Sequence, residues 1–216
     1  MKVKICGVCR AVDAAAVAAA GADFIGVILA PGSRRTLGLD AAREVLAAAP
    51  KVRKVGVFVD ASVAAIVHAV SYLGLNVVQL HGAESPQDVT ALRAHASVWK
   101  AVRVREPSDV ERAAERYSGV DALLLDAWHP GQAGGTGTAF DWAAISARRD
   151  SLPAGLRIVL AGGLTPENVS AAVRTLRPYV VDVSSGVEVA AGVKSPERIQ
   201  AFVAAARAAP ASPIES

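Results

Sequence analysis

Short apolar runs alternate with longer amphipathic runs along the whole chain. The short runs are rich in β-branched residues, as strands are, and the longer runs carry apolar residues at helical spacing. The predicted strands cover 2–6, 23–29, 54–59, 76–80, 97–102, 122–126, 157–161 and 179–183. The predicted helices cover 11–20, 40–49, 62–73, 85–96, 107–116, 141–149 and 195–208, with one more between the last two strands. Eight strand-then-helix repeats predict an α/β fold whose parallel sheet closes into a (β/α)8 TIM barrel.

The length of 216 residues is enough for one such barrel and leaves no room for a second domain of similar size. We expect a single domain over 1–208, with its active site at the carboxyl ends of the strands, and a disordered tail over 209–216. An open doubly wound sheet is the alternative. That fold usually carries a GxGxxG turn after its first strand, whereas this chain has Gly7-Val8-Cys9-Arg10 there.

Composition and charge narrow the class of partner. The chain is 52% hydrophobic but only 5% aromatic, which is typical of helices packed on a parallel sheet. The net charge of +3 is scattered, and no basic stripe with interleaved aromatics indicates nucleic acid. Residues 1–7 contain no apolar h-region, and no run is long or apolar enough to span a bilayer, so we expect neither a secretory leader nor a membrane span. We therefore expect a cytoplasmic protein with two reduced cysteines, an anionic small-molecule partner and no membrane or nucleic-acid partner.

Two consecutive strand–helix units end in turns that suit an anion. Gly162 and Gly163 follow the seventh strand, and Ser184, Ser185 and Gly186 follow the eighth. Small side chains let backbone N–H groups converge on an anion, and a short helix beginning at Ser185 would add its N-terminal dipole. Either turn alone could be an ordinary loop, but the pair predicts the phosphate site that follows strands seven and eight of such barrels.

Cys6 closes the first strand, and Lys4 lies on the same strand face one layer deeper. A lone cysteine at this place is most often a small buried hydrophobe, but the carboxyl end of a barrel strand is also where barrel chemistry occurs. Cys6 and Cys9 also form a C-x-x-C between a strand and a helix, so a thiol redox function is an alternative. A second cysteine pair is absent from the sequence, and we predict no metal site.

Further candidates stand at the ends of other strands. Asp126 closes the apolar sixth strand, where desolvation favours the protonated form of a carboxyl group, although a loop or capping aspartate is equally ordinary. The loop after it contains Gly-Gly-Thr-Gly at 134–137, and we expect it to be mobile and able to contact an anion. Gln79 and His81 share one face of the fourth strand. They are either core residues with hydrogen-bond partners or members of a binding site.

Two charged residues need partners. In the loop after the second strand, Arg35 follows Ser33 and Arg34, and its guanidinium suits a carboxylate, although such a pair of arginines is more often solvated. Asp182 lies on the eighth strand, where it would be an unpaired buried charge unless it meets a cation such as Lys4.

Taken together, these stretches resemble one family. They are KICG at 4–7, GAD at 21–23, Ser33-x-Arg35, GVFV at 56–59, VQLHG at 78–82, LLLD at 123–126, GGTG at 134–137, FDW at 140–142, LAGGL at 160–164 and VDVSSGVE at 181–188. From about residue 2 to 208 the chain looks like the phosphoribosylanthranilate isomerases of tryptophan biosynthesis. The departures are small: Asp60 stands where that family often has Asn, and Ala30-Pro31-Gly32 replaces a stretch that is often more aromatic.

The resemblance implies a cofactor-free Amadori rearrangement of N-(5-phosphoribosyl)anthranilate to 1-(2-carboxyphenylamino)-1-deoxyribulose 5-phosphate. It assigns Cys6 as the general base at C2 of the sugar and Asp126 as the general acid at the furanose oxygen. It also implies that Arg35 binds the anthranilate carboxylate. The remaining candidates are substrate contacts at Gln79, His81 and Asp182, and phosphate contacts at Gly162, Gly163, Ser184, Ser185 and Gly186. The protein is expected to be a monomer or a homodimer.

The chemistry independently asks for an acid and a base on opposite sides of the sugar. A thiol with an unperturbed pKa of ~8.5 is only about 3% thiolate at pH 7, so we expect Lys4 to lower the pKa of Cys6. The alternatives are the related histidine-pathway isomerase, whose substrate carries two phosphates, and a dual-substrate isomerase. Outside that class stand the C-x-x-C redox protein and a non-catalytic barrel that binds a phosphorylated ligand.

Overall fold

The computed structural model of the protein describes residues 1–127 and 141–209. Eight parallel strands form a closed barrel in which each strand pairs with its neighbours in chain order and β8 pairs with β1. The strands are β1 (Lys2–Ile5), β2 (Phe24–Ile28), β3 (Arg53–Phe58), β4 (Val77–Leu80), β5 (Ser97–Val104), β6 (Ala122–Ala127), β7 (Ile158–Leu160) and β8 (Val180–Val183). The predicted (β/α)8 barrel is therefore confirmed.

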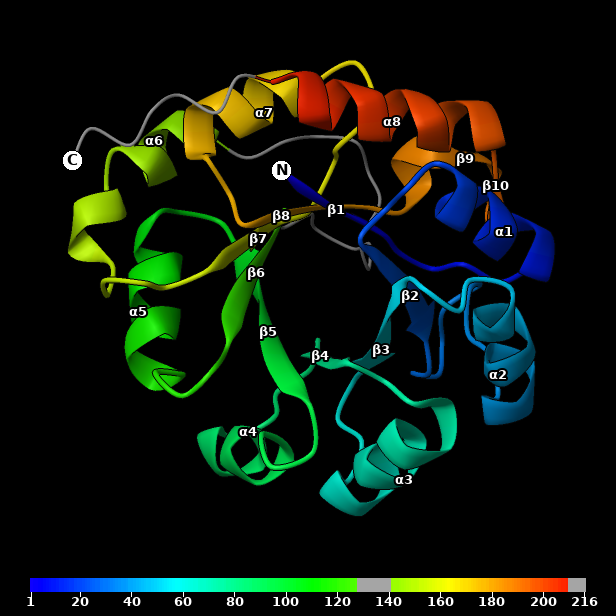
Figure 1. Ribbon diagram of the computed structural model, residues 1–216. Coiled ribbons are helices and arrows are strands. Elements are labelled where there is room, and N and C mark those ends of the chain that lie inside the picture. Colours follow the sequence, from blue (N-terminus) through cyan, green and yellow to red (C-terminus); the bar gives the residue numbers. More distant parts are fainter. Residues whose placement is uncertain (128–140, 210–216) are drawn as a thin grey trace.

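The helices form a ring outside this barrel (Figure 1). They are α1 (Ala11–Ala19), α2 (Leu39–Ala47), α3 (Val63–Leu73), α4 (Pro86–Leu92), α5 (Ser108–Arg116), α6 (Trp142–Ser146), α7 (Val169–Leu176) and α8 (Pro196–Ala208). Several begin at side chains that accept a backbone N–H: Ser62 caps α3, Ser195 caps α8, and Ser85 forms a capping box with Asp88 at α4. None of the helices in the described ranges is long and apolar enough to span a bilayer.

Apolar side chains fill two layers. The larger layer lies between the strands and the ring of helices, and it buries side chains such as Ile25, Leu46 and Phe202. The smaller layer fills the barrel interior with Phe24, Val55, Val77, Trp99, Ala122, Leu124, Val159, Ala161 and Val180. Because successive side chains of a strand alternate between its faces, each strand serves both layers.

Four details differ from the sequence prediction. The helix predicted over 85–96 ends at Leu92. In place of the helix predicted over 141–149, α6 ends at Ser146 and a separate 3-10 turn, η1 (Arg149–Ser151), follows it. After β8 the chain forms another 3-10 turn, η2 (Ser185–Val187). A small antiparallel hairpin follows, β9 (Glu188–Ala190) and β10 (Val193–Lys194). The expectations for 134–137 and for the tail beyond 209 lie outside the described residues.

Candidate active site

A cavity of about 740 Å³ lies at the carboxyl ends of the barrel strands. Every site residue predicted from the sequence lines it: Cys6, Arg35, Gln79, His81, Asp126, Gly162, Gly163, Asp182, Ser184, Ser185 and Gly186. The period of two along each strand explains this convergence. On β4, for example, Val77 belongs to the apolar barrel interior, and Gln79 and His81, two and four residues on, line the cavity.

Lys4 lies at the floor of this site and is completely buried. Its Nζ donates to Asp182 Oδ2 at 2.8 Å and to Gln79 Oε1 at 2.9 Å. The expected pairing of Asp182 with Lys4 is therefore confirmed. Burial opposes the charge on Lys4, but the nearby Asp182 carboxylate and Cys6 together raise the pKa of this ammonium group. The second carboxylate oxygen of Asp182, Oδ1, is buried without a hydrogen-bond partner within the described ranges.

Cys6 is buried, with only 7% of the residue exposed. We expected Lys4 to bring its pKa below the ordinary value. Lys4 does act in that direction, but the expected net lowering is wrong for the free protein. Burial raises the pKa of Cys6, and the nearby carboxylate of Asp182 reinforces burial, so that the attraction of Lys4 only partly offsets them. The sequence placed the cation correctly and anticipated its pairing with Asp182, but it could not show how deeply Cys6 would be buried.

Gln79 and His81 connect Lys4 to the candidate acid. Gln79 Nε2 lies 3.2 Å from His81 Nδ1, and His81 Nε2 lies 3.3 Å from Asp126 Oδ2. If the amide donates to Nδ1, the ring carries its hydrogen on Nε2 and donates it to Asp126. Both residues therefore belong to a polar network rather than to the apolar core, and this network joins the floor of the site to Asp126.

The two glycine- and serine-containing turns contact each other at the edge of the cavity. Gly162 and Gly163 have φ angles of +78° and +67°, which L side chains rarely adopt. A Cβ on Gly186 would collide with the carbonyl oxygen of Leu164, so only glycine lets the turn after β8 approach the turn after β7 this closely. A short 3-10 turn does begin at Ser185, but it has only three residues. A turn this short has little helix dipole, so an anion bound there would depend on backbone N–H groups instead.

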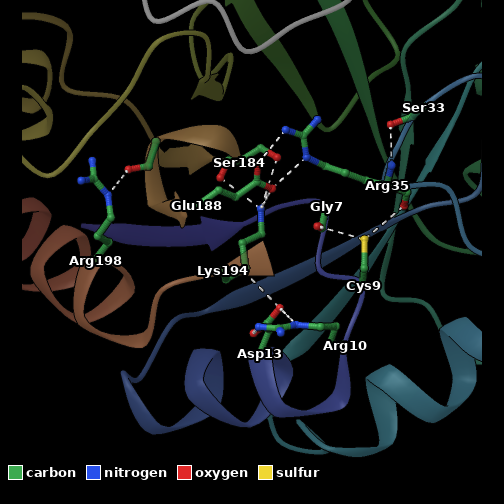
Figure 2. Close-up of polar contacts among 11 residues, drawn as sticks. Gly7, Cys9, Arg10, Asp13, Ser33, Arg35, Ser184, Glu188, Lys194 and Arg198 are labelled. Carbon is green, nitrogen blue, oxygen red and sulfur yellow. Dashed lines mark hydrogen bonds and ion pairs between the residues drawn. The ribbon is translucent and has the colours of Figure 1, made fainter. Parts of the chain in front are cut away.

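Arg35 is held by a carboxylate of its own chain (Figure 2). Its Nε donates to Glu188 Oε1 at 2.8 Å, and its NH2 group donates to Glu188 Oε2 at 2.7 Å. The side chain is 19% exposed, whereas the neighbouring Arg34 is exposed. The solvated-loop alternative is thus wrong for Arg35.

Cys9 contacts two backbone carbonyls near Arg35 (Figure 2). Its Sγ lies 3.5 Å from the oxygen of Gly7 and 3.5 Å from the oxygen of Arg35. Cys6 and Cys9 are both free thiols. The C-x-x-C therefore places one thiol in the cavity lining and the other against the loop that carries Arg35.

Sequence reasoning missed three charged side chains beside the site. Glu188 stood inside a quoted motif, but a single glutamate after a turn gave no sign of a partner 153 residues away. Lys194 lies on the unpredicted hairpin, so no periodicity indicated it. Arg103 lines the cavity from β5 and carried no sequence signal that we can identify.

Comparison with known proteins agrees with this geometry. Residues 3–205 match the family model described as N-(5'phosphoribosyl)anthranilate (PRA) isomerase. The chain belongs to the phosphoribosylanthranilate isomerase family. It is 44% identical over 210 residues to the N-(5'-phosphoribosyl)anthranilate isomerase of Thiobacillus denitrificans, which covers 96% of this chain and 98% of that protein. The corresponding isomerase of Rubrobacter xylanophilus is 44% identical over 208 residues, covering 95% and 98%.

Solved structures of family members share the fold. The phosphoribosylanthranilate isomerase of Thermotoga maritima superposes with a TM-score of 0.87 at 39% identity, covering 96% of this chain and 98% of that one. Another isomerase structure, with a TM-score of 0.84 at 38% identity and coverage of 96% and 98%, is a complex with reduced 1-(o-carboxyphenylamino)-1-deoxyribulose 5-phosphate. A chain of this family therefore binds a ligand with a carboxylate at one end and a phosphate at the other.

Proposed function

We propose that this chain is the isomerase of tryptophan biosynthesis that converts N-(5'-phosphoribosyl)anthranilate into 1-(2-carboxyphenylamino)-1-deoxyribulose 5-phosphate. The observation that carries the proposal is the meeting of Cys6, Asp126, Arg35 and the two anion-suited turns in one cavity. The substrate needs a proton acceptor, a proton donor, a cation for its carboxylate and a phosphate cradle, and these side chains and turns supply one of each.

Cys6 is the general base and Asp126 is the general acid in this proposal. Asp126 protonates the furanose oxygen as the ring opens to an iminium ion, and Cys6 removes the proton from C2 to give an enolamine, which tautomerises to the aminoketose. The bond to the ring oxygen breaks, the C1–C2 bond becomes double, and no electron acceptor is needed. The free thiol is buried with a raised pKa, so the developing positive charge of the iminium ion is expected to promote its deprotonation.

Arg35 is the expected partner of the anthranilate carboxylate. A guanidinium group has five N–H donors, and Glu188 takes one from Nε and one from NH2, so three remain for a ligand. Asp182 Oδ1 is the expected acceptor for a sugar hydroxyl, because it is a buried oxygen without a partner among the described side chains and lies in a residue that lines the cavity. The turns at 162–163 and 184–186 are the expected phosphate site.

The other half of the barrel argues against a substrate with two phosphates. Backbone N–H groups after β3 and β4 are already bonded to carboxylates. After β3, Asp60 N donates to Glu84; after β4, Gly82 N donates to Glu84 and Ala83 N donates to Asp60. Asp60 has a φ angle of +51°, a conformation that Asn and Asp tolerate better than most residues. The departure from Asn at this position therefore leaves the local backbone intact and adds a negative charge that disfavours a second phosphate.

The direct test is turnover. Purified protein is mixed with freshly generated phosphoribosylanthranilate, and the loss of anthranilate-type fluorescence is followed. Cys6→Ala should lower kcat by roughly a hundredfold or more because it removes a proton acceptor. Inorganic phosphate should still inhibit competitively at the wild-type concentration in residual turnover, because the change removes no phosphate contact.

A matched substitution separates this role from the redox alternative. Cys9→Ser should be nearly silent, because within the described residues the Cys9 thiol is hydrogen-bonded to carbonyl oxygens, to which a hydroxyl can also donate. Equal losses from the two substitutions would favour the redox function. Activity of the wild type with no loss in Cys6→Ala would remove Cys6 from the mechanism.

We also propose the cellular location and the assembly of the protein. A free thiol as general base favours a reducing compartment, so we propose a cytoplasmic location. The Thermotoga maritima isomerase is described as dimeric, and monomeric forms of it have been solved. A monomer or a homodimer is therefore the expected assembly here.

A further inference from the structure

A buried charge cluster lies beside the carboxylate-binding end of the cavity. Glu188 is the first residue of β9, and its side chain is only 5% exposed. It receives hydrogen bonds from two cations, the guanidinium of Arg35 and the ammonium of Lys194, the latter 2.8 Å from Oε1 (Figure 2). Glu188 is therefore a carboxylate shared between a group of the proposed site and a group behind it.

Lys194 joins this carboxylate to the turn after β8. Its side chain is fully buried, and its Nζ also donates to the carbonyl oxygen of Ser184 at 3.0 Å and contacts Ser184 Oγ at 3.4 Å. Its backbone N–H donates to Asp13 of α1, which also pairs with Arg10 (Figure 2). The side chain of Lys194 is thus held on several sides and has little freedom to leave Glu188.

The charges of the cluster do not cancel. Burial lowers the pKa of Lys194, although Glu188 counteracts it. Burial also opposes ionisation of Glu188, but hydrogen bonds from Arg35 and Lys194 lower its pKa below the usual value. With Glu188 ionised, two cations face one carboxylate, so a substrate carboxylate at Arg35 would balance the remaining positive charge.

The loop after β1 leaves a narrow space through which the Arg35 side chain passes. A Cβ on Gly7 would lie 2.6 Å from Cδ of Arg35 and 3.0 Å from Oγ of Ser184. The missing side chain of Gly7 lets the stem of Arg35 pass between β1 and the turn after β8. An arginine has many rotamers, and the two-point contact with Glu188 selects one of them before any ligand arrives.

We propose that Glu188 is the positioning residue of the carboxylate site, and that Lys194 ties it to the phosphate turn at Ser184. The proposal rests on the proposed function. Glu188 contacts no substrate in it. It holds the Arg35 guanidinium so that the three remaining donors face the cavity, and Lys194 holds the two anion-binding ends of the site at a fixed separation.

The first test compares Glu188→Gln with Glu167→Gln. Glu167 is a matched control, because it lies 69% exposed and 4.0 Å from Arg198 in the same group of loops. A glutamine keeps the length of Glu188 but cannot accept from two cations with two charged oxygens. Glu188→Gln should raise KM for phosphoribosylanthranilate by about tenfold while kcat changes much less, and Glu167→Gln should change neither.

A second substrate separates positioning from general damage. Phosphoribosylaniline lacks the carboxylate, so its kcat/KM should fall no more than about twofold in Glu188→Gln if the loss belongs to the carboxylate contact. In an Arg35→Ala background, Glu188→Gln should cost nothing further. Glu188→Asp keeps the carboxylate on a shorter side chain, and it should raise KM for phosphoribosylanthranilate less than Glu188→Gln does.

Lys194→Met tests the link to the phosphate turn. This change should weaken competitive inhibition by inorganic phosphate severalfold, whereas Glu188→Gln should leave it within about twofold of the wild type. Equal losses on both substrates, full additivity with Arg35→Ala, or a Glu188→Gln enzyme like the Glu167→Gln control would each overturn the proposal. A wild-type protein that turns over neither substrate would instead refute the proposed function.

Discussion

At the scale of single residues, the tertiary environment sets the pKa of Cys6 and the orientation of the Arg35 guanidinium. Cys6 has a cation one layer below it, yet burial and the neighbouring Asp182 raise the pKa of its thiol. Arg35 stands in a loop, yet Glu188 fixes its guanidinium. For Cys6 the largest effect is burial, and for Arg35 it is a carboxylate 153 residues away, so neither effect could be found from the neighbouring sequence.

The first prediction concerns the titration of Cys6. Because its pKa is raised, its thiolate should form above the ordinary value of ~8.5, and kcat/KM should still be rising with pH above neutrality. Thiolate absorbance in the ultraviolet measures this directly. The titration belongs in a Cys9→Ser background, because burial also raises the pKa of Cys9.

Cys6→Ser in the same background is the control, and it should abolish the titration. A Cys6 thiolate already complete at neutral pH would contradict the burial argument. It would also restore the original expectation that Lys4 dominates the pKa of this thiol.

At the scale of elements, the approach of two turns depends on one missing side chain. Gly186→Ala should push the turn after β8 away from Leu164, because the new Cβ has no room beside that carbonyl. Competitive inhibition by inorganic phosphate should weaken by roughly tenfold, as expected when about 1.4 kcal/mol of binding is lost. Inhibition kinetics at constant ionic strength measure this effect.

Gly119→Ala is the matched control for Gly186→Ala. A Cβ at Gly119 would meet nothing within 4 Å, so this change should leave phosphate inhibition unaltered. If both variants bind phosphate like the wild type, the turns at 162–163 and 184–186 are not the phosphate site.

Barrel closure provides the second prediction at this scale. Lys4 of β1 stands opposite Asp182 of β8, and their side chains form a buried ion pair. Lys4→Met should lower the free energy of unfolding by about 3–5 kcal/mol because it leaves a buried carboxylate without its cation. Urea denaturation measures the loss.

The pH dependence of this loss of stability in Lys4→Met tests whether the unpaired carboxyl group of Asp182 causes it. Burial already raises the pKa of Asp182, and Lys4→Met removes the main group that opposes this effect. The folded variant then holds a proton that the unfolded chain releases, so its stability should fall as pH rises from 5 to 8. Adding Asp182→Leu should recover most of the stability, and a variant as unstable at pH 5 as at pH 8 would argue against this cause.

Elements with a strong period were predictable, and those determined by tertiary contact were not. All eight strands and their order followed from short β-branched runs between helical ones, and strand alternation placed Gln79, His81 and Asp126 correctly in the cavity lining. The β9–β10 hairpin was missed because it is short and stands where a loop was expected. The sequence indicated Arg35 as a candidate site residue. It could not show that Glu188 is the partner of Arg35, because no local pattern encodes a pair 153 residues apart.

At the scale of the whole molecule, the two halves of the barrel treat anions differently. The turns after β7 and β8 line the cavity, whereas backbone N–H groups after β3 and β4 are bonded to Asp60 and Glu84. We therefore predict turnover of phosphoribosylanthranilate but none of the histidine-pathway aldose, which carries two phosphates. Assays of both substrates at equal enzyme concentration test this, and comparable turnover of both would show a dual-substrate enzyme.

Glu84 has a further consequence, because it acts as an internal ligand. Its carboxylate lies 3.0 Å from the buried ammonium of Lys100, and it also accepts the backbone N–H groups of Asp60 and Gly82. A tethered anion competes at a high effective concentration that no dissolved phosphate reaches. We therefore expect this half of the barrel to reject a second phosphate, because its backbone N–H groups are already bonded to carboxylates of the chain. Neutral substitutions at Glu84 and Asp60 would vacate the amides beside a buried cation, which gives evolution or design a short route to a broader substrate range.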